Sequence, residues 1–279
     1  MWQLQIWDWK YSTISSSILA ALNGSALLVD FCFLGNNRLL VITDNLNLYS
    51  IENISQPPEL LACFLMPISW DLQYLSPIND IGYGSQPHMQ AQATMCTSDP
   101  THRLICLTAF TRVGTQVFII STRIFFDLNG VAAATPTPWQ HWGPSNTRII
   151  WHPFHFKIHI NGNRVLHTLP LGARNLQFIL NLLDFSPLAV TNRRGLGRVV
   201  KEPSTTYIGA DGFGESLTTS LPYVEVVFSH RTFDCAGSLL RDMWIDKDGI
   251  YMLSGSGSTD RLEVIDVRSD LPSDVVSTS

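Results

Sequence analysis

The sequence predicts an all-β protein, a WD-repeat-like β-propeller. Apolar residues alternate in short runs bounded by turn residues, one strand–turn pattern occurs near both ends of the chain, and no long amphipathic helix is evident. The chain has 279 residues, of which 45% are hydrophobic and 15% are charged, which is enough for one large domain with its own core. We therefore expect a single propeller-like domain over residues 1–279, incomplete or irregular, with about five or six blades.

The N-terminal quarter of the chain predicts a meander of short strands. The first strand is expected at Leu4–Trp9. Phe31 and Phe33 then share one face of a second strand, with Cys32 on the other face. "GNN" at 35–37 supplies residues that accept positive φ and predicts a tight hairpin. "RLLVIT" and "DNLNLYSI" predict the two strands that follow.

The same pattern occurs again near the C-terminus. "RDMWIDKDGIYMLSGSGSTDRLEVIDVRS" aligns with "VDFCFLGNNRLLVITDNLNLYSIENIS", with Asp242 in the place of Asp30. These two residues lie about five blade lengths apart, at ~40–45 residues per blade. "TRIFFDL" at 122–128 is expected to close a similar unit in the middle of the chain. We expect Leu4–Trp9 to be the last strand of a repeat whose earlier strands are missing, and to pair with C-terminal strands such as "RLEVIDV".

Further strands and loops are expected between these two regions. Loops are expected where Pro, Gly or Ser gather, at 67–90, 129–143 and 209–220. The remaining strands are expected at Leu104 to Arg112, Thr115 to Ser121, Arg148 to Trp151, His155 to Ile160, Asn163 to Leu169, Leu176 to Phe185 and Val224 to Ser229.

Composition narrows the classes of partner. The net charge of −5 argues against nucleic acid or an anionic membrane as a partner. The five cysteines are odd in number and show no C-x-x-C spacing, which is typical of reduced thiols in a cytoplasmic or nuclear protein. No uncharged apolar run approaches the ~18 residues of a membrane-spanning helix.

Three histidines in "WHPFHFKIH", at 152, 155 and 159, raise the question of a metal site. Residues four apart in a strand lie about 13 Å apart, too far to share one ion. We expect instead a strand with Phe154, Phe156, Ile158 and Ile160 inside and His155, Lys157 and His159 outside. "RRGLGR" at 193–198 is expected to be a solvated hairpin loop rather than a phosphate site, and "DKDG" a turn. We expect no metal, no cofactor and no catalytic residue.

Five motifs carry a family resemblance: "IWDWK" (6–10), "W-G-P-x-N-T-R" (142–148), "LLDFSP" (182–187), "VVKEPST" (199–205) and "LPYVEV" (221–226). In this order they resemble the C-terminal, propeller-like region of the F-box proteins of mushroom-forming (basidiomycete) fungi. The resemblance implies a substrate receptor of a cullin-type ubiquitin ligase, in which an F-box docks the adaptor and the propeller holds a protein target. No F-box precedes Trp7, so adaptor docking is expected only if an F-box exists upstream.

The expected function is therefore a protein-interaction module rather than an enzyme. One alternative is a free-standing propeller scaffold with no ligase link. A second is a propeller hydrolase using acidic residues near strand ends, such as Asp30, Asp184 and Asp242. For each of these three carboxylates we favour a turn or a strand-end hydrogen bond over catalysis.

The candidates for contact with a protein target are aromatic and basic residues on loops at one rim of the propeller: Trp139, His141, Trp142, Arg193 and Arg194. Trp142 and Arg148 also admit a structural interpretation, a buried indole and an arginine paired across blades, which we favour. The tryptophans at 7, 9, 139, 142 and 151 are expected in the core.

Overall fold

The structure is a computed structural model, in which the chain forms two compact units. The first unit comprises Met1–Leu75, Cys96–His152 and Pro203–Leu221, and the second comprises the remaining segments. The residues described are 2–6, 18–21, 30–67, 72–75, 100–110, 115–130, 135–152, 157–171, 177–191, 197–208, 215–229, 233–234, 239–246, 249–256 and 259–266. A single domain over residues 1–279 stays a prediction.

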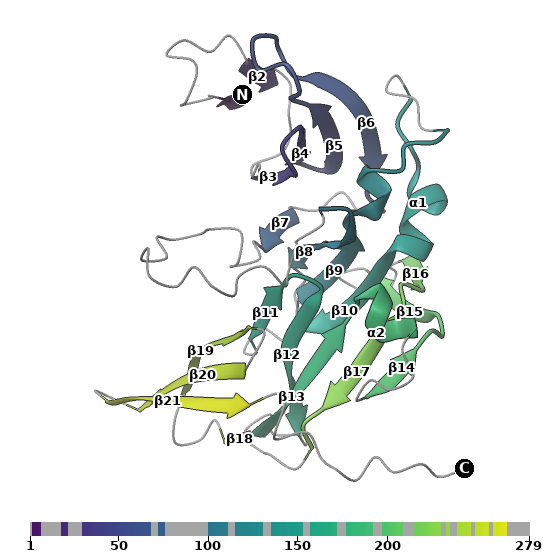
Figure 1. Cartoon of the computed structure of the whole chain (residues 1–279). Coiled ribbons are helices and arrows are strands. Elements are labelled where there is room, and N and C mark those ends of the chain that lie inside the picture. Colours follow the sequence, from purple (N-terminus) through teal and green to yellow (C-terminus); the bar gives the residue numbers. More distant parts are fainter. Residues whose placement is uncertain are drawn as a thin grey trace. The chain divides into compact units, whose positions relative to one another are not determined.

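The first unit contains two four-stranded antiparallel sheets whose strands follow chain order (Figure 1). One sheet is β3 (Asp30–Leu34), β4 (Arg38–Ile42), β5 (Asn45–Ser50) and β6 (Glu59–Leu65). The other is β7 (Leu72–Leu75), β8 (Leu104–Phe110), β9 (Thr115–Ser121) and β10 (Thr147–His152). The predicted hairpin at "GNN" is confirmed, because Gly35 has a φ of 68° between the paired strands β3 and β4. A short 3-10 helix, η3 (Pro100–His102), precedes β8.

Two hairpins complete the first unit. β1 (Trp2–Gln5) pairs with β2 (Ile18–Ala21), and β15 (Ser204–Ile208) pairs with β16 (Glu215–Thr219). The predicted pairing of the N-terminal strand with "RLEVIDV" is therefore wrong for the described residues. The reason is local burial: Leu4 and Leu19 of the β1–β2 hairpin pack against the buried Leu39 and Val41 of β4.

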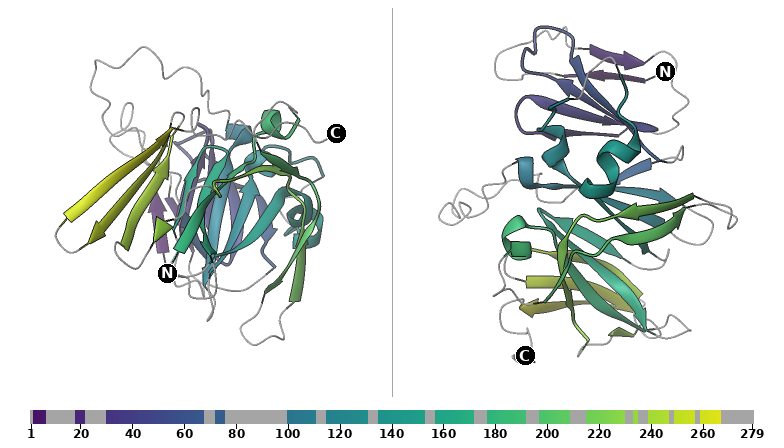
Figure 2. Two further views of the ribbon diagram at one scale, coloured as in Figure 1. Left: turned by 90° about the horizontal axis from the view of Figure 1, so that it is seen from below. Right: turned by 90° about the vertical axis from the view of Figure 1, so that its right-hand side faces the viewer.

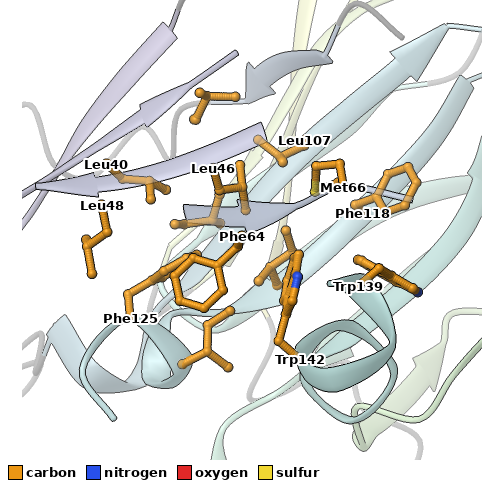
Figure 3. Packing of buried hydrophobic residues seen from close by; sticks show 14 of the residues in the cluster. Leu40, Leu46, Leu48, Phe64, Met66, Leu107, Phe118, Phe125, Trp139 and Trp142 are labelled. Atoms are coloured by element: carbon orange, nitrogen blue, oxygen red, sulfur yellow. The ribbon is translucent and has the colours of Figure 1, made fainter. Parts of the chain in front are cut away.

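The main core of the first unit forms where β5, β6, β8 and β9 meet the helix α1 (Trp139–Asn146). In Figure 3, Trp142 points from α1 toward Phe64 and Phe125. The ring centroid of Phe64 lies 5.3 Å from that of Phe125 and 5.6 Å from that of Trp142, and both ring pairs are edge-to-face. Such pairs add to the stabilisation that comes from burial of apolar area.

The strand predicted at "TRIFFDL" is wrong, because Thr122–Phe125 forms a 3-10 helix, η4. Ile124 and Phe125 are consecutive and both buried, whereas successive residues of a strand face opposite sides of its sheet. Arg38 holds this turn in place, since its guanidinium donates to the carbonyl oxygen of Phe125 and lies 4.8 Å from the ring centroid of Phe126.

The second unit contains a six-stranded and a three-stranded antiparallel sheet. Leu166, Leu180 and Leu182 of the larger sheet pack in one core with Met243 and Met252 of the smaller. The larger sheet is β11 (Ile158–Asn161), β12 (Arg164–Leu171), β13 (Gln177–Asp184), β17 (Tyr223–Val227) and β14 (Arg198–Val200), with β18 (Phe233–Asp234) beside β13. The smaller is β19 (Leu239–Ile245), β20 (Gly249–Ser256) and β21 (Thr259–Asp266), drawn in yellow-green in Figure 2.

The predicted all-β class is confirmed, and most predicted strands occur within a few residues of their expected ends. The loops expected at 67–90, 129–143 and 209–220 hold described elements that sequence did not predict, namely β7, the start of α1 and β16. The other described α-helix is the short α2 (Pro187–Thr191). Within the described ranges, no helix is long and apolar enough to cross a membrane.

Replacing Gly197, which precedes β14, should destabilise the second unit. Gly197 has a φ of +114°, and a Cβ there would lie 2.5 Å from the carbonyl oxygen of Glu225. We expect Gly197→Ala to lower the free energy of unfolding by about 2 kcal/mol, measured by urea unfolding. Gly162→Ala is the matched control, because its φ is +58° and nothing lies within 4 Å of its Cβ. It should cost only about 1 kcal/mol, and an equal cost for both variants would contradict a clash at Gly197.

Candidate functional site

The predicted partner-binding residues on α1 divide into buried and exposed side chains. Trp139 and Trp142 are each 4% exposed and belong to the core of the first unit, whereas His141 is exposed. The two indoles are therefore not surface anchors in this structure. Arg193 and Arg194 lie outside the described residues, and contact through them stays a prediction.

Helix α1 packs into the core of the first unit through its two tryptophans, Trp139 and Trp142. The indole Nε1 of Trp142 donates to the carbonyl oxygen of Leu65 at 3.1 Å, which satisfies the one polar group of this buried side chain. The two indole rings meet edge-to-face with centroids 4.8 Å apart. Gly143 makes this possible, because a Cβ at that position would lie 2.3 Å from the ring of Trp139. The structural interpretation of Trp142 is the one that its burial supports.

Arg148, at the end of the same motif, is also buried, with 2% of its surface exposed. Its Nε donates to the carbonyl oxygen of Leu221 at 3.0 Å, and its Nη1 donates to the Oγ of Ser204 at 2.9 Å. Ser204 belongs to "VVKEPST" and Leu221 begins "LPYVEV", so one guanidinium joins three motifs that are far apart in sequence. We call Arg148, Ser204 and Leu221 the motif joint.

The motif joint holds the β15–β16 hairpin beside β10. The amide of Ser220 donates to the carbonyl oxygen of Pro144 at 2.8 Å, and the amide of Leu221 donates to that of Thr147 at 3.1 Å. The amide of Ile149 donates to the Oγ1 of Thr219 at 3.2 Å. The "W-G-P-x-N-T-R" motif is therefore an architectural element within the described part of the first unit.

The two remaining motifs are "LLDFSP", which is described in full, and "IWDWK", which is described at its first residue. In "LLDFSP", Asp184 accepts from the amide of Ser186 at 2.9 Å and from the Nε of Arg164 at 3.2 Å. The Oγ of Ser186 accepts from the amide of Ala189 at 3.1 Å and caps the first turn of α2. Of "IWDWK", only Ile6 is described, and it is buried.

Besides Phe31 and Phe33 of β3, the aromatic side chains exposed on the first unit include two that were not among the predicted partner-contact residues. Trp151 at the end of β10 is 48% exposed, so its predicted place in the core is wrong, and Tyr207 of β15 is 76% exposed. Both residues neighbour Gln116. It lies opposite Trp151 in the β9–β10 register, and its Nε2 donates to the carbonyl oxygen of Tyr207 at 3.2 Å. We call Trp151 and Tyr207 the aromatic pair.

No periodicity signal could have found the aromatic pair. Trp151 lies two residues after the buried Ile149 and so shares its face of β10, which made a core position the natural prediction. The strand ends one residue later, and the core beneath it ends before Trp151.

The histidine pattern in the second unit also differs from prediction. His159 is 5% exposed and lies opposite Leu166, on the core face of β12, so its expected outward position is wrong. Burial lowers the pKa of His159, and the negative charge of Asp242 partly opposes that shift. His155 lies outside the described residues. Among the residues that the structure describes, no three His, Cys, Asp or Glu side chains lie close enough together to hold a metal ion.

The lowered pKa of His159 predicts how stability changes with pH. The folded state takes up a proton at His159 less readily than the unfolded chain, whose histidine pKa is about 6.5. The contribution of this residue is therefore fully present above about pH 6.5 and is lost as the pH falls toward the lower folded pKa. In His159→Asn, the loss of stability between pH 7.5 and 5.5, measured by urea unfolding, should be smaller than in the wild type. An unchanged pH dependence would contradict this assignment.

The carboxylates considered for hydrolysis occupy structural positions. Asp184 is the strand-end acceptor described above, in agreement with its expected role. Asp242 is an exposed residue of β19 that accepts from the neighbouring amide of Met243 at 2.8 Å. Asp30 is the first residue of β3, at the edge of its sheet.

Three cysteines lie within the described residues, Cys32, Cys63 and Cys106, and none of these three forms a disulfide. Burial raises the pKa of the Cys63 thiol and raises that of the fully enclosed Cys106 strongly. These groups stay protonated at neutral pH and are poor nucleophiles. Cys96 and Cys235 lie outside the described residues.

Comparison with protein-family models, with curated proteins and with solved structures finds no match for this chain.

Proposed function

We propose that this chain is a protein-interaction module, the target-binding region of an F-box-type receptor of a cullin ubiquitin ligase. The observation that carries the interaction role is the aromatic pair, two large side chains that are exposed on one unit and related through Gln116. Tyr and Trp are enriched among residues that dominate the binding energy of protein interfaces. The motif joint supports the resemblance, because residues from three of its five motifs meet at the buried guanidinium of Arg148.

The fold proposed for this module is a WD-repeat-like propeller with an incomplete or irregular ring. The sheets β3–β6 and β7–β10 support it, because each is a four-stranded antiparallel meander in chain order, as a propeller blade is. The same proposal gives the protein a cytoplasmic or nuclear location. Its target is a protein rather than nucleic acid or a membrane.

Proximity labelling in cells tests the interaction role. We compare the wild type with Trp151→Ala/Tyr207→Ala and with Leu188→Ala, a control that truncates a side chain 80% exposed on α2. The expected result is a group of labelled proteins that the double variant loses and the control keeps. Equal labelling by all three proteins would overturn the role of the aromatic pair.

The ligase role has its own test. The chain is expressed with and without an F-box segment fused before Trp2, and recovery of the cullin adaptor is compared. Recovery only with the F-box supports a receptor that depends on an upstream segment. Equal recovery without it would contradict adaptor docking through an F-box, and failure in both forms would favour the free-standing scaffold.

A further inference from the structure

The outer strand of the smaller sheet in the second unit has an open edge among the described strands. The order of this sheet is β19–β20–β21, and β21 pairs with β20 along its whole length (Figure 2). No other described strand pairs with β21. Leu262 and Val264 are each 54% exposed on one face of it. An eight-residue edge strand with exposed apolar side chains is a surface on which another strand can pair.

The sequence of β21 complements itself in one antiparallel register. If two copies pair about a two-fold axis at Leu262, each Leu262 lies opposite its counterpart. Arg261 then lies opposite Glu263 of the second copy, and this contact occurs twice. Thr259 lies opposite Ile265 and Asp260 opposite Val264, again twice each. Opposite charges on directly facing residues stabilise a strand pair, and like charges destabilise it.

Neighbouring registers lack this complementarity. A two-fold axis at Glu263 places Glu263 against itself and Asp260 against Asp266, and an axis at Arg261 places Arg261 against itself. Among two-fold registers centred on residues 260 to 265, only the one centred on Leu262 places opposite charges on directly facing residues of β21.

We infer that two copies of this chain associate by antiparallel pairing of their β21 strands, centred on Leu262. The two three-stranded sheets then form one six-stranded sheet with isologous two-fold symmetry. Asp260 does not oppose this arrangement, because Arg241 compensates its charge within the same sheet at 3.0 Å. On the exposed face, Leu262 and Val264 adjoin Leu253 and Tyr251 of β20, whose ring stacks on Trp244 at 5.6 Å. Pairing extends this apolar strip across both copies, and it does not depend on the proposed function.

Charge reversal tests the pairing. Sedimentation velocity and light scattering over a concentration series measure the dimer of the wild type, Arg261→Glu, Glu263→Arg and the double variant Arg261→Glu/Glu263→Arg. Each single variant faces like charges twice and should raise the dissociation constant about tenfold or more. The double variant restores opposite charges across the two-fold axis and should recover the wild-type dissociation constant. Arg123→Glu, a reversal on an exposed arginine of the first unit, should leave it unchanged.

Three outcomes would overturn this inference. The first is a wild-type chain that stays monomeric at every concentration, which would assign this edge to another strand. The second is a dimer that the single variants leave intact, which would place the contact on another surface. The third is failure of the double variant to recover the dimer while circular dichroism shows all variants folded.

Discussion

Trp142→Ala should be the most destabilising single substitution in the described part of the first unit, lowering the free energy of unfolding by about 3–5 kcal/mol. The indole is 4% exposed, packs edge-to-face with Phe64 at 5.6 Å and Trp139 at 4.8 Å, and donates to the carbonyl oxygen of Leu65. Alanine leaves a cavity in the core and a carbonyl oxygen without this donor. Urea unfolding followed by circular dichroism measures the loss.

Two further variants separate packing from helix effects. Gln140→Ala changes an exposed residue of the same helix and should alter the free energy of unfolding by less than about 0.5 kcal/mol. Trp142→Phe keeps most of the apolar volume but removes the Nε1 donor, so its loss should be smaller than that of alanine. A loss below about 1 kcal/mol for Trp142→Ala would contradict the structural role of this residue.

Arg148→Met should lower the free energy of unfolding by about 3–4 kcal/mol, because two hydrogen bonds from a buried charged donor are lost. Methionine keeps much of the side-chain length, so the effect reports the polar contacts to Leu221 and Ser204 more than lost volume. The loss should also be local, because these contacts hold the β15–β16 hairpin. Hydrogen exchange of β15 and β16 should therefore accelerate more in this variant than exchange of β4 and β5.

Controls for the motif joint are available at each contact. Arg148→Lys keeps the charge but not the planar fork of donors, and should fall between the wild type and methionine. Ser204→Ala removes one acceptor and should cost about 1 kcal/mol. If Arg148→Met accelerated exchange equally throughout the first unit, the arginine would support the whole core rather than the hairpin.

Local sequence pattern accounts for most of the strands. β4, β5, β9 and β12 occur close to their predicted ends, because alternation of apolar residues and turn residues such as Gly35 act over a few neighbours. The pattern failed where two consecutive apolar residues are both buried, as at Ile124 and Phe125, since there a helical turn replaces the strand. It also missed β16, whose polar residues lie in a segment that contacts distant parts of the chain.

The candidate site depended on contacts that sequence pattern does not contain. Trp139 and Trp142 are buried, whereas Trp151 is exposed. The difference follows from which elements cover each residue, and those elements lie up to about 80 residues away in the sequence. His159 was expected outside because its neighbours alternate with it. It is buried because a second sheet packs on that face of β11, where the side chain of Asn161 donates to the carbonyl oxygen of Ile245 at 2.6 Å.

The all-β class, the hairpin at 35–37 and the short meanders could be predicted from the sequence, because these features depend on residues close together in the chain. Three features appear only in the folded chain: the contacts of Arg148 with Ser204 and Leu221, the exposure of Trp151 and Tyr207, and the pairing of β1 with β2. They could not be predicted because burial and hydrogen-bond satisfaction are set by long-range packing, for which one amphipathic strand offers several equally good partners.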